Sequence, residues 1–227
     1  MRIVAVADTH TYQNHLGVLP AGDVFIHAGD MLQHGTLDEL EVVAKWMRQL
    51  PHRHKVVIAG NHDWCFARRP SAARKLLGGG ILFLEDEGVT IEGVSFWGSP
   101  WQPEFFGWAF NLKRGPQIAA KWKLIPDRVD VLVTHGPPRG IRDLTHDGPA
   151  GCDDLLEAIA GRHVGAHLFG HIHEDGGTLE RDGTLYANVT TWECERGATV
   201  IDVEAGVARA VHVPKRNPAT EALRERE

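Results

Sequence analysis

Short apolar runs rich in valine and isoleucine recur along the chain and predict buried strands. The clearest of them are residues 2–7, 23–29, 55–59, 129–133 and 166–169. Successive positions in these runs are apolar, which is typical of strands that a parallel sheet buries on both faces. Further apolar segments predict strands at 81–84, at 89–97 with a turn at Glu92-Gly93, at 184–189, and at 198–213 with a turn at Ala205-Gly206.

A different spacing predicts helices between these strands. From Thr36 to Leu50 the apolar positions recur with a helical period, and Thr36 with Glu39 forms the pattern of a capping box. Shorter helices are expected at 70–77, 116–124 and 152–160. The aromatic-rich segment 98–111 lacks such a period, and we interpret it as a long loop with helical turns. Strands alternating with helices predict an α/β fold with a mostly parallel sheet.

Composition and charge narrow the class of protein. The 227 residues are 43% hydrophobic and 24% charged, typical of a globular domain, and we expect one domain over 1–213 followed by a polar tail at 214–227. The net charge of −6 argues against a protein that holds long nucleic acids. No apolar run approaches the roughly 20 residues of a membrane span, and the first apolar run is too short for a signal peptide, so we expect no membrane partner and a cytoplasmic location.

Side chains that bind metals follow five of the apolar runs. The seven candidate ligands are Asp8, His10, Asp30, Asn61, His135, His171 and His173. Taken alone, each motif is also typical of a turn or of a structural histidine. Because the ends of parallel strands share one edge of a sheet, we expect these distant segments to converge there. Seven ligands are too many for one ion and suit two ions, for which Asp30 is the natural bridging carboxylate.

The ligand types indicate which ions and which substrates to expect. Carboxylate and imidazole suit Mn²⁺, which we favour, as well as Fe, Zn, Co or Ni, and no cysteine joins the set. Two divalent ions outweigh the charges of Asp8, Asp30 and a bridging hydroxide, so the site is expected to attract a phosphate ester. That hydroxide would be a nucleophile at neutral pH. His62 beside Asn61 can carry a proton near neutrality and is the candidate catalytic residue.

The order of these motifs resembles that of the calcineurin-like metallophosphoesterases. The motifs are Asp-x-His, Gly-Asp, Gly-Asn-His-Asp, Thr-His-Gly and Gly-His-x-His, and the resemblance covers 2–213. Further stretches, such as 25–30, 134–138 and 170–174, resemble the small phosphodiesterases of the MPPED type. The resemblance implies an αββα sandwich of two mixed sheets flanked by helices. It also implies one metal at Asp8, His10, Asp30 and His173, and a second at Asp30, Asn61, His135 and His171.

The substrate is predicted from the resemblance and from the aromatic segment. We expect a phosphodiesterase acting on small esters such as cyclic nucleotides, with Asn61 and His62 contacting the substrate and His62 protonating the leaving group or stabilising the phosphoryl group. Trp101 could stack a nucleobase, although a ring that only packs the core is the alternative. Two other functions stay open, a phosphomonoesterase of broad range and a nucleotide-binding regulatory protein of low activity. His34 and Arg139 follow ligand positions, and we interpret both as ordinary loop residues.

Overall fold

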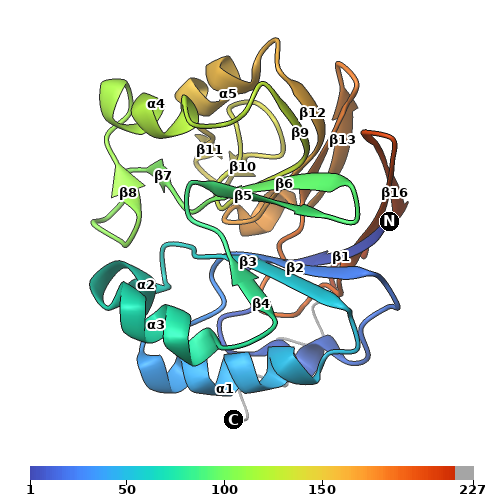
Figure 1. Cartoon of the computed structure of the whole chain (residues 1–227). Helices are drawn as coiled ribbons and strands as arrows, with labels where there is room; N and C mark the ends of the chain where they lie inside the picture. Colours follow the sequence, from blue (N-terminus) through green and yellow to red (C-terminus); the bar gives the residue numbers. More distant parts are fainter. Residues whose placement is uncertain (218–227) are drawn as a thin grey trace.

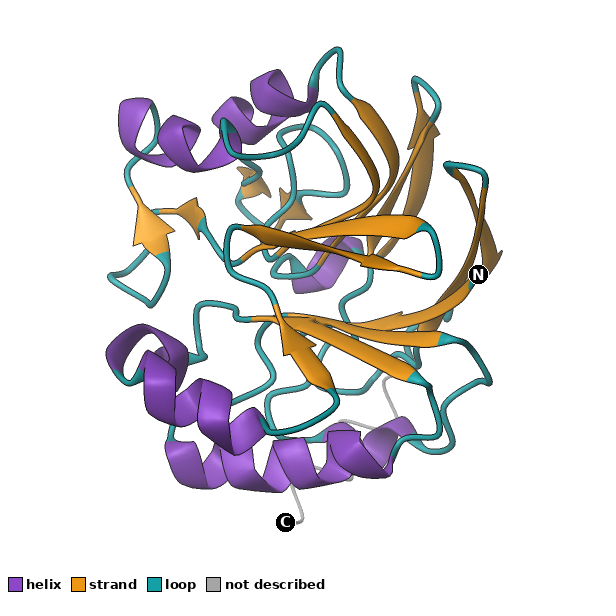
Figure 2. Cartoon of the chain, in the orientation of Figure 1, coloured by secondary structure: helices purple, strands orange, loops and turns teal. Residues whose placement is uncertain are grey.

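Two six-stranded sheets lie face to face with helices on both outer sides in the computed structural model, which describes residues 1–217 (Figure 1). Colouring by secondary structure separates the four layers, helix, sheet, sheet and helix (Figure 2). The predicted αββα sandwich of two mixed sheets is confirmed. Of the predicted polar tail, residues 218–227 lie outside the described part of the chain.

The first sheet contains the N-terminal strands. Its order is β16-β15-β1-β2-β3-β4, with β1 to β4 parallel and β15 and β16 added antiparallel at one side. The strands are β1 (Arg2–Val6), β2 (Val24–Ala28), β3 (His54–Ile58), β4 (Ile81–Phe83), β15 (Thr199–Glu204) and β16 (Val207–His212).

The second sheet has the order β13-β14-β12-β9-β6-β5, with a parallel centre and one antiparallel strand at each edge. Its strands are β5 (Glu87–Ile91), β6 (Val94–Ser99), β9 (Arg128–Thr134), β12 (His163–Phe169), β13 (Gly177–Arg181) and β14 (Thr184–Asn188). Two small ribbons pair β7 (Gln102–Pro103) with β8 (Asn111–Leu112), and β10 (Leu144–Thr145) with β11 (Gly148–Pro149).

Helices cover the outer face of each sheet (Figure 1). The first sheet carries α1 (Leu37–Gln49), α2 (Trp64–Arg68) and α3 (Pro70–Leu77), and the second carries α4 (Pro116–Trp122) and α5 (Asp153–Ile159). Two 3₁₀ turns are η1 (Gln13–Leu16) and η2 (His173–Asp175). The predicted capping box begins α1, since the Thr36 hydroxyl accepts from the backbone of Glu39 at 3.2 Å and the Glu39 carboxylate accepts from the backbone of Thr36.

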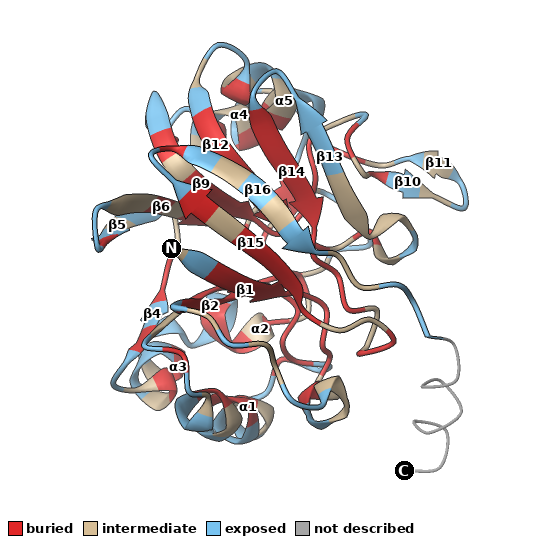
Figure 3. Ribbon diagram, turned by 90° about the vertical axis from the view of Figure 1, so that its right-hand side faces the viewer, coloured by how far each residue is buried: buried red, intermediate tan, exposed pale blue. Residues whose placement is uncertain are grey.

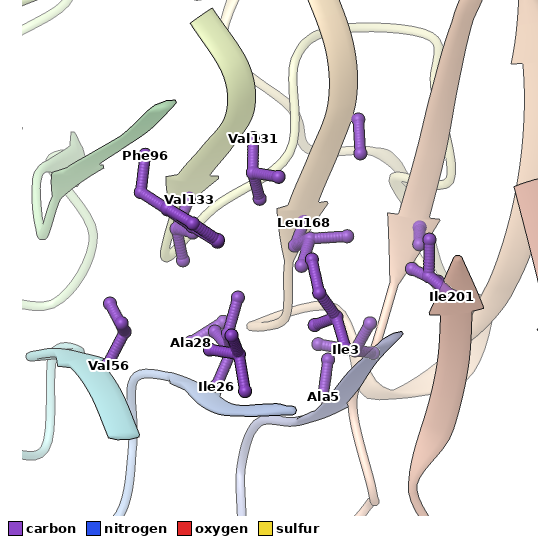
Figure 4. Close-up of a cluster of buried hydrophobic side chains, with 14 of the residues drawn as sticks. Ile3, Ala5, Ile26, Ala28, Val56, Phe96, Val131, Val133, Leu168 and Ile201 are labelled. Carbon is purple, nitrogen blue, oxygen red and sulfur yellow. The ribbon is translucent and has the colours of Figure 1, made fainter. Parts of the chain in front are cut away.

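A core cluster of buried side chains lies between the two sheets (Figure 4). Ile3 and Ile26 project from the first sheet toward Val133 and Leu168 of the second, and all four are fully buried. β-Branched side chains pack well on a pleated surface, which accounts for their enrichment in these strands. Exposed positions gather instead on β13 and β16 (Figure 3).

Several elements of the structure differ from the sequence predictions. The short helix α2 and the edge strand β13 were not predicted. The segment 98–111 contains the β7–β8 pairing and no helical turn. The strands that precede the candidate ligands do not share one sheet, because β1, β2 and β3 belong to the first sheet and β9 and β12 to the second. Among residues 1–217, no helix has the length and apolar character to cross a membrane.

Candidate metal centre

The candidate ligands meet where the two sheets come together. The backbone nitrogen of His171, just after β12, donates to both carboxylate oxygens of Asp8, just after β1, at 3.1 and 3.0 Å. In the described part of the chain, three groups of side chains have ligand atoms within 4.8 Å of one another. The groups are Asp8 with His10 and His173, His10 with Asp30 and His62, and Asp30 with His135 and His171.

The first group surrounds the buried carboxylate of Asp8. The Nε2 atom of His173 lies 3.8 Å from Asp8 Oδ1. His10 uses Nδ1 to contact the backbone oxygen of Leu32 at 3.3 Å, which leaves its Nε2 atom toward Asp30 at 3.9 Å. A hydrogen bond at one imidazole nitrogen orients the other, as in many metal sites.

The third group, Asp30 with His135 and His171, surrounds the fully buried side chain of His135. Its Nδ1 atom lies 3.0 Å from the backbone oxygen of Ala28, an acceptor, so Nδ1 carries the proton. Its Nε2 atom lies 3.3 Å from Asp30 and 3.0 Å from the side-chain oxygen of Asn61. Asp30 therefore lies between the two groups, within 4 Å of a histidine from each.

The buried carboxyl and imidazole groups of the cluster shift one another's pKa values. Burial opposes the ionisation of Asp8 and Asp30, but the neighbouring histidines, His173 at Asp8 and His135 at Asp30, outweigh burial and lower the pKa of both carboxyls. Burial also opposes the charged form of His135, yet Asp30 and Asp8 raise its pKa to about 9. Burial and the charge of His135 lower the pKa of His171 to about 3. Two buried carboxylates gathered with imidazoles are a donor set that fits divalent transition metals.

The backbone is strained at four of the candidate ligands. Asp8, His10, Asp30 and His171 have φ angles of 54°, 43°, 53° and 68°, in the left-handed region that L residues rarely adopt. Such conformations concentrate at functional sites, where surrounding structure enforces them. The turns aim these side chains toward one another as the chain leaves each strand.

Two residues of the Gly60-Asn61-His62-Asp63 stretch shape the turn without serving as ligands. A Cβ atom on Gly60 would lie 2.6 Å from Cε1 of His135 and would also overlap the Asp30 carboxylate. The buried Asp63 carboxylate accepts from the backbone nitrogens of Gly60 at 2.7 Å and Leu32 at 2.9 Å. Asp63 thus ties the loop after β3 to the loop after β2.

His62 is oriented by two hydrogen bonds. Its backbone nitrogen donates to Asp30 at 2.8 Å, and its Nδ1 atom lies 2.8 Å from the backbone oxygen of Gln33. Because a carbonyl oxygen only accepts, Nδ1 carries a proton, and Nε2 is the nitrogen left to meet a ligand. The half-buried ring lines the same cavity as His10, Asp30 and His171.

A cavity of about 630 Å³ opens over the clustered histidines. Its walls beyond His62 and His171 include Phe105, Arg114, Asp147 and Trp192. These residues were not singled out from the sequence, although the aromatic richness of 98–111 was a signal for Phe105. Trp101 is not among the residues that line this cavity, so its predicted substrate contact loses geometric support. Its indole nitrogen donates to Asp86 at 2.9 Å, and Lys121 lies 4.3 Å above its ring.

Two other loop residues also lie outside the cavity walls in the described structure. His34 is exposed, and its backbone nitrogen donates to the carboxylate of Glu39. The guanidinium of Arg139 donates to the backbone oxygen of Pro149 at 2.7 Å. Their placement agrees with the interpretation of both as ordinary loop residues.

Comparison with known proteins identifies relatives over most of the chain. The family model for calcineurin-like phosphoesterases matches residues 1–175. Metallophosphoesterase domain-containing protein 1 from Homo sapiens is 38% identical over 214 residues, covering 83% of this chain and 65% of its own length. UPF0046 protein K07C11.7 from Caenorhabditis elegans is 37% identical, covering 87% of this chain and 71% of its own. The chain thus spans slightly less than two thirds of the human relative.

A solved structure shares the fold at low sequence identity. The crystal structure of TT1561 from Thermus thermophilus superposes with a TM-score of 0.62 over 92% of this chain and 97% of its own, at 11% identity. At that identity the match supports the architecture alone.

Proposed function

Because the chain belongs to the calcineurin-like phosphoesterase family of metal-dependent phosphoester hydrolases, we propose that it hydrolyses small phosphodiesters at the cluster around Asp30. The observation that carries the proposal is the position of Asp30, whose carboxylate lies within 4 Å of His10 on one side and of His135 on the other. A carboxylate placed between two ligand groups can bridge two ions.

Two divalent ions, with Mn²⁺ the favoured identity, would divide the ligands between them. Asp8, His10, Asp30 and His173 would hold one, and Asp30, Asn61, His135 and His171 the other. When bound, the ions lower the pKa of a water molecule and withdraw electron density from the phosphoryl group. The chain supplies their geometry through the strained turns at Asp8 and Asp30, which orient the carboxylates before any ion arrives.

His62 is proposed as the general acid, and its side chain and that of Asn61 as contacts to the phosphoryl oxygens. In the proposed step His62 acts as an imidazolium, protonated at both ring nitrogens; water adds to phosphorus, the bond to the ester oxygen breaks, the departing alcohol takes the Nε2 proton, and Nδ1 keeps its own. The proton that the attacking water loses is released to solvent, from which His62 is protonated again for the next turnover. The hydrogen bond from Nδ1 to Gln33 supports this assignment because it leaves Nε2 facing the reacting centre.

The charge of the cavity wall favours diesters over monoesters. Besides Asp30, the carboxylates of Glu104, Asp147 and Glu174 line the wall, whereas Arg114 is paired with Asp153 at 3.4 Å. A phosphodiester carries one negative charge and a monoester close to two at neutral pH, so this wall repels the monoester more strongly. A cyclic nucleotide is the natural form of such a small diester.

Phe105 is the aromatic residue of the cavity wall that is best placed to stack a nucleobase. Its side chain is partly exposed and meets the ring of His171 edge-on with ring centroids 5.8 Å apart. Aromatic rings stack on bases through apolar and dispersion contacts. Phe105 therefore replaces Trp101 in the proposal for base recognition.

Initial rates with added Mn²⁺ on bis(p-nitrophenyl) phosphate, p-nitrophenyl phosphate and 3′,5′-cyclic AMP test the proposal. We expect the diesters to be cleaved faster than the monoester, and the Asp30→Asn variant to be inactive on all three. Phe105→Ala should raise KM for cyclic AMP roughly 5- to 20-fold. Its control is Leu124→Ala, because Leu124 is 50% exposed and absent from the cavity wall, whereas Phe106 packs on the ring of Phe105. Faster cleavage of the monoester would show that the protein is a phosphomonoesterase and not a phosphodiesterase.

A further inference from the structure

Residues 102–111 form an arm that is fastened against the metal centre. The buried amide of Gln102 donates to the backbone oxygen of Ala109 and to the side chain of Asn111, both at 2.8 Å. From the same arm, the backbone nitrogen of Ala109 donates to the backbone oxygen of Asn61 at 3.2 Å. These hydrogen bonds fix the position of the arm relative to Asn61, one of the proposed ligands.

Trp108, the residue before Ala109, stacks on the ring of His62. The rings of Trp108 and His62 have centroids 4.2 Å apart and planes inclined by 25°. His10 meets His62 edge-on, at 4.5 Å and 79°. The imidazole of His62 is thus bounded on its face by an indole and at its edge by another ring, and Gln33 accepts from its Nδ1 atom.

These contacts restrict different motions of the ring. The hydrogen bond to Gln33 decides which nitrogen faces the cavity, but one hydrogen bond leaves the plane of the imidazole free to tilt. Stacking against Trp108 fixes that plane, since a tilt would break the parallel ring contact. The indole itself has limited freedom, because the arm that carries it is held by Gln102 and by Asn61.

We propose that Trp108 is a positioning residue for His62, holding its imidazole so that Nε2 meets the ester oxygen that leaves phosphorus. This inference rests on the proposed function, because it assigns Trp108 a part in the same proton transfer. Trp108 stacks on His62 and is not among the residues that line the cavity, so its effect passes through His62. General acids act only when held within hydrogen-bond reach of the atom they protonate.

Leaving-group dependence separates positioning from simple packing. p-Nitrophenolate leaves with little help from an acid, whereas phenolate needs a proton. We therefore compare bis(p-nitrophenyl) phosphate with diphenyl phosphate. Trp108→Ala should lower kcat on diphenyl phosphate roughly 10- to 100-fold and kcat on the p-nitrophenyl ester by less than about threefold. Trp108→Phe should restore most of the loss. In a His62→Ala background, Trp108→Ala should cause no further loss of kcat on diphenyl phosphate.

Trp46→Ala is the matched control. Trp46 is a partly buried tryptophan of α1 that packs edge-on against Phe25, far along the chain from the arm. Its removal should lower stability without changing the ratio of rates on the two esters. Equal losses on both esters in Trp108→Ala, an additive loss in the double variant, or no loss at all would overturn the proposal.

A second readout does not depend on turnover. Long-range ¹H–¹⁵N spectra of the metal-free protein report the tautomer of each histidine, and the His62→Ala spectrum identifies the signals of His62. At a pH at which the ring is neutral, wild-type protein and Trp46→Ala should show His62 as a single tautomer protonated at Nδ1; in Trp108→Ala the ring can tilt away from Gln33, so the signals should average between the two tautomers. Unchanged His62 signals would refute the positioning role. Wild-type protein that cleaves neither ester would defeat the proposed function, while these spectra still decide whether Trp108 orders His62.

Discussion

The backbone of His171 and the carboxylate of Asp8 are joined by two hydrogen bonds although the residues follow strands of different sheets. Asp8 leaves β1 of the first sheet, and His171 leaves β12 of the second. Hydrogen bonds within the protein thus join the two sheets at the point where the candidate ligands gather. Because these contacts do not involve Asp30, the bridging role of Asp30 can be tested in a folded protein.

Asp30→Asn should lower the bound metal from two ions per chain to one or none. The amide lacks the negative charge with which a carboxylate bridges two ions. Elemental analysis after dialysis against Mn²⁺ measures the stoichiometry. Asp202→Asn is the control, since Asp202 lies on β15 and pairs with Arg2 at the surface. An Asp30→Asn protein that retains both ions would exclude the bridge.

His62→Ala should lower kcat roughly 10²- to 10⁴-fold on esters with poor leaving groups, while the bound metal is unchanged. The physical reason is that Nε2 of His62 supplies the proton that an alkoxide or phenolate requires. Steady-state rates on cyclic AMP, together with metal analysis, provide the measurement. His34→Ala removes an exposed histidine outside the cavity wall and should retain wild-type rates. Full activity in His62→Ala would assign the proton transfer elsewhere.

Gly60→Ala should reduce both metal affinity and activity by at least roughly tenfold. An added methyl group would overlap the Asp30 carboxylate and the ring of His135, so both side chains must shift. Gly79→Ala is the matched control, because a Cβ there meets no atom within 4 Å and the residue has no positive φ. Metal titration and kcat/KM in both variants measure the effect. A Gly60→Ala enzyme that matches Gly79→Ala would show that the turn relaxes freely.

His167→Gln should weaken the dependence of stability on pH below neutrality. Burial lowers the pKa of His167 to about 3, so the folded state keeps it neutral while the unfolded chain protonates it near pH 6.5. The unfolded state binds more protons between these values, and stability therefore falls as pH falls from about 6.5 toward 3. This histidine alone should account for about 2 kcal/mol between pH 7 and pH 5.

Urea unfolding with a chelator present measures that difference, because chelation removes metal release from the comparison. The exposed His212 provides the control substitution, His212→Gln. His27, also buried with its pKa lowered to about 3, remains in the variant, so part of the pH dependence should persist. Equal slopes for wild type and His167→Gln would mean that His167 becomes protonated without unfolding.

The strands and the candidate ligands were predictable because both are local in sequence. An apolar run such as 129–133 followed by His135 shows a buried strand and the polar residue at its end together. The partition of strands between two sheets is not local, since β6 pairs with β9 across a long insertion. The edge strand β13 escaped prediction because Gly177–Arg181 is mostly polar and exposed, and antiparallel pairing with β14 holds it in place.

Side-chain direction within the aromatic segment could not be predicted either. Trp101, Phe105 and Trp108 lie within eight positions and have similar chemistry. The β7–β8 pairing and the buried amide of Gln102 decide that Trp101 faces Asp86, Phe105 the cavity and Trp108 the ring of His62. No period of two or 3.6 residues encodes those directions, so only the folded arm reveals them.

Because the candidate ligands follow strands of both sheets, the geometry of the centre depends on how the two sheets are spaced. Val133 and Leu168 pack between the sheets near the ends of β9 and β12, the strands that precede His135 and His171. A smaller side chain there would let the layers slide by fractions of an ångström, a shift that folding tolerates and proton transfer does not. The side chains packed between the sheets therefore determine the spacing of the candidate ligands as well as the stability of the fold.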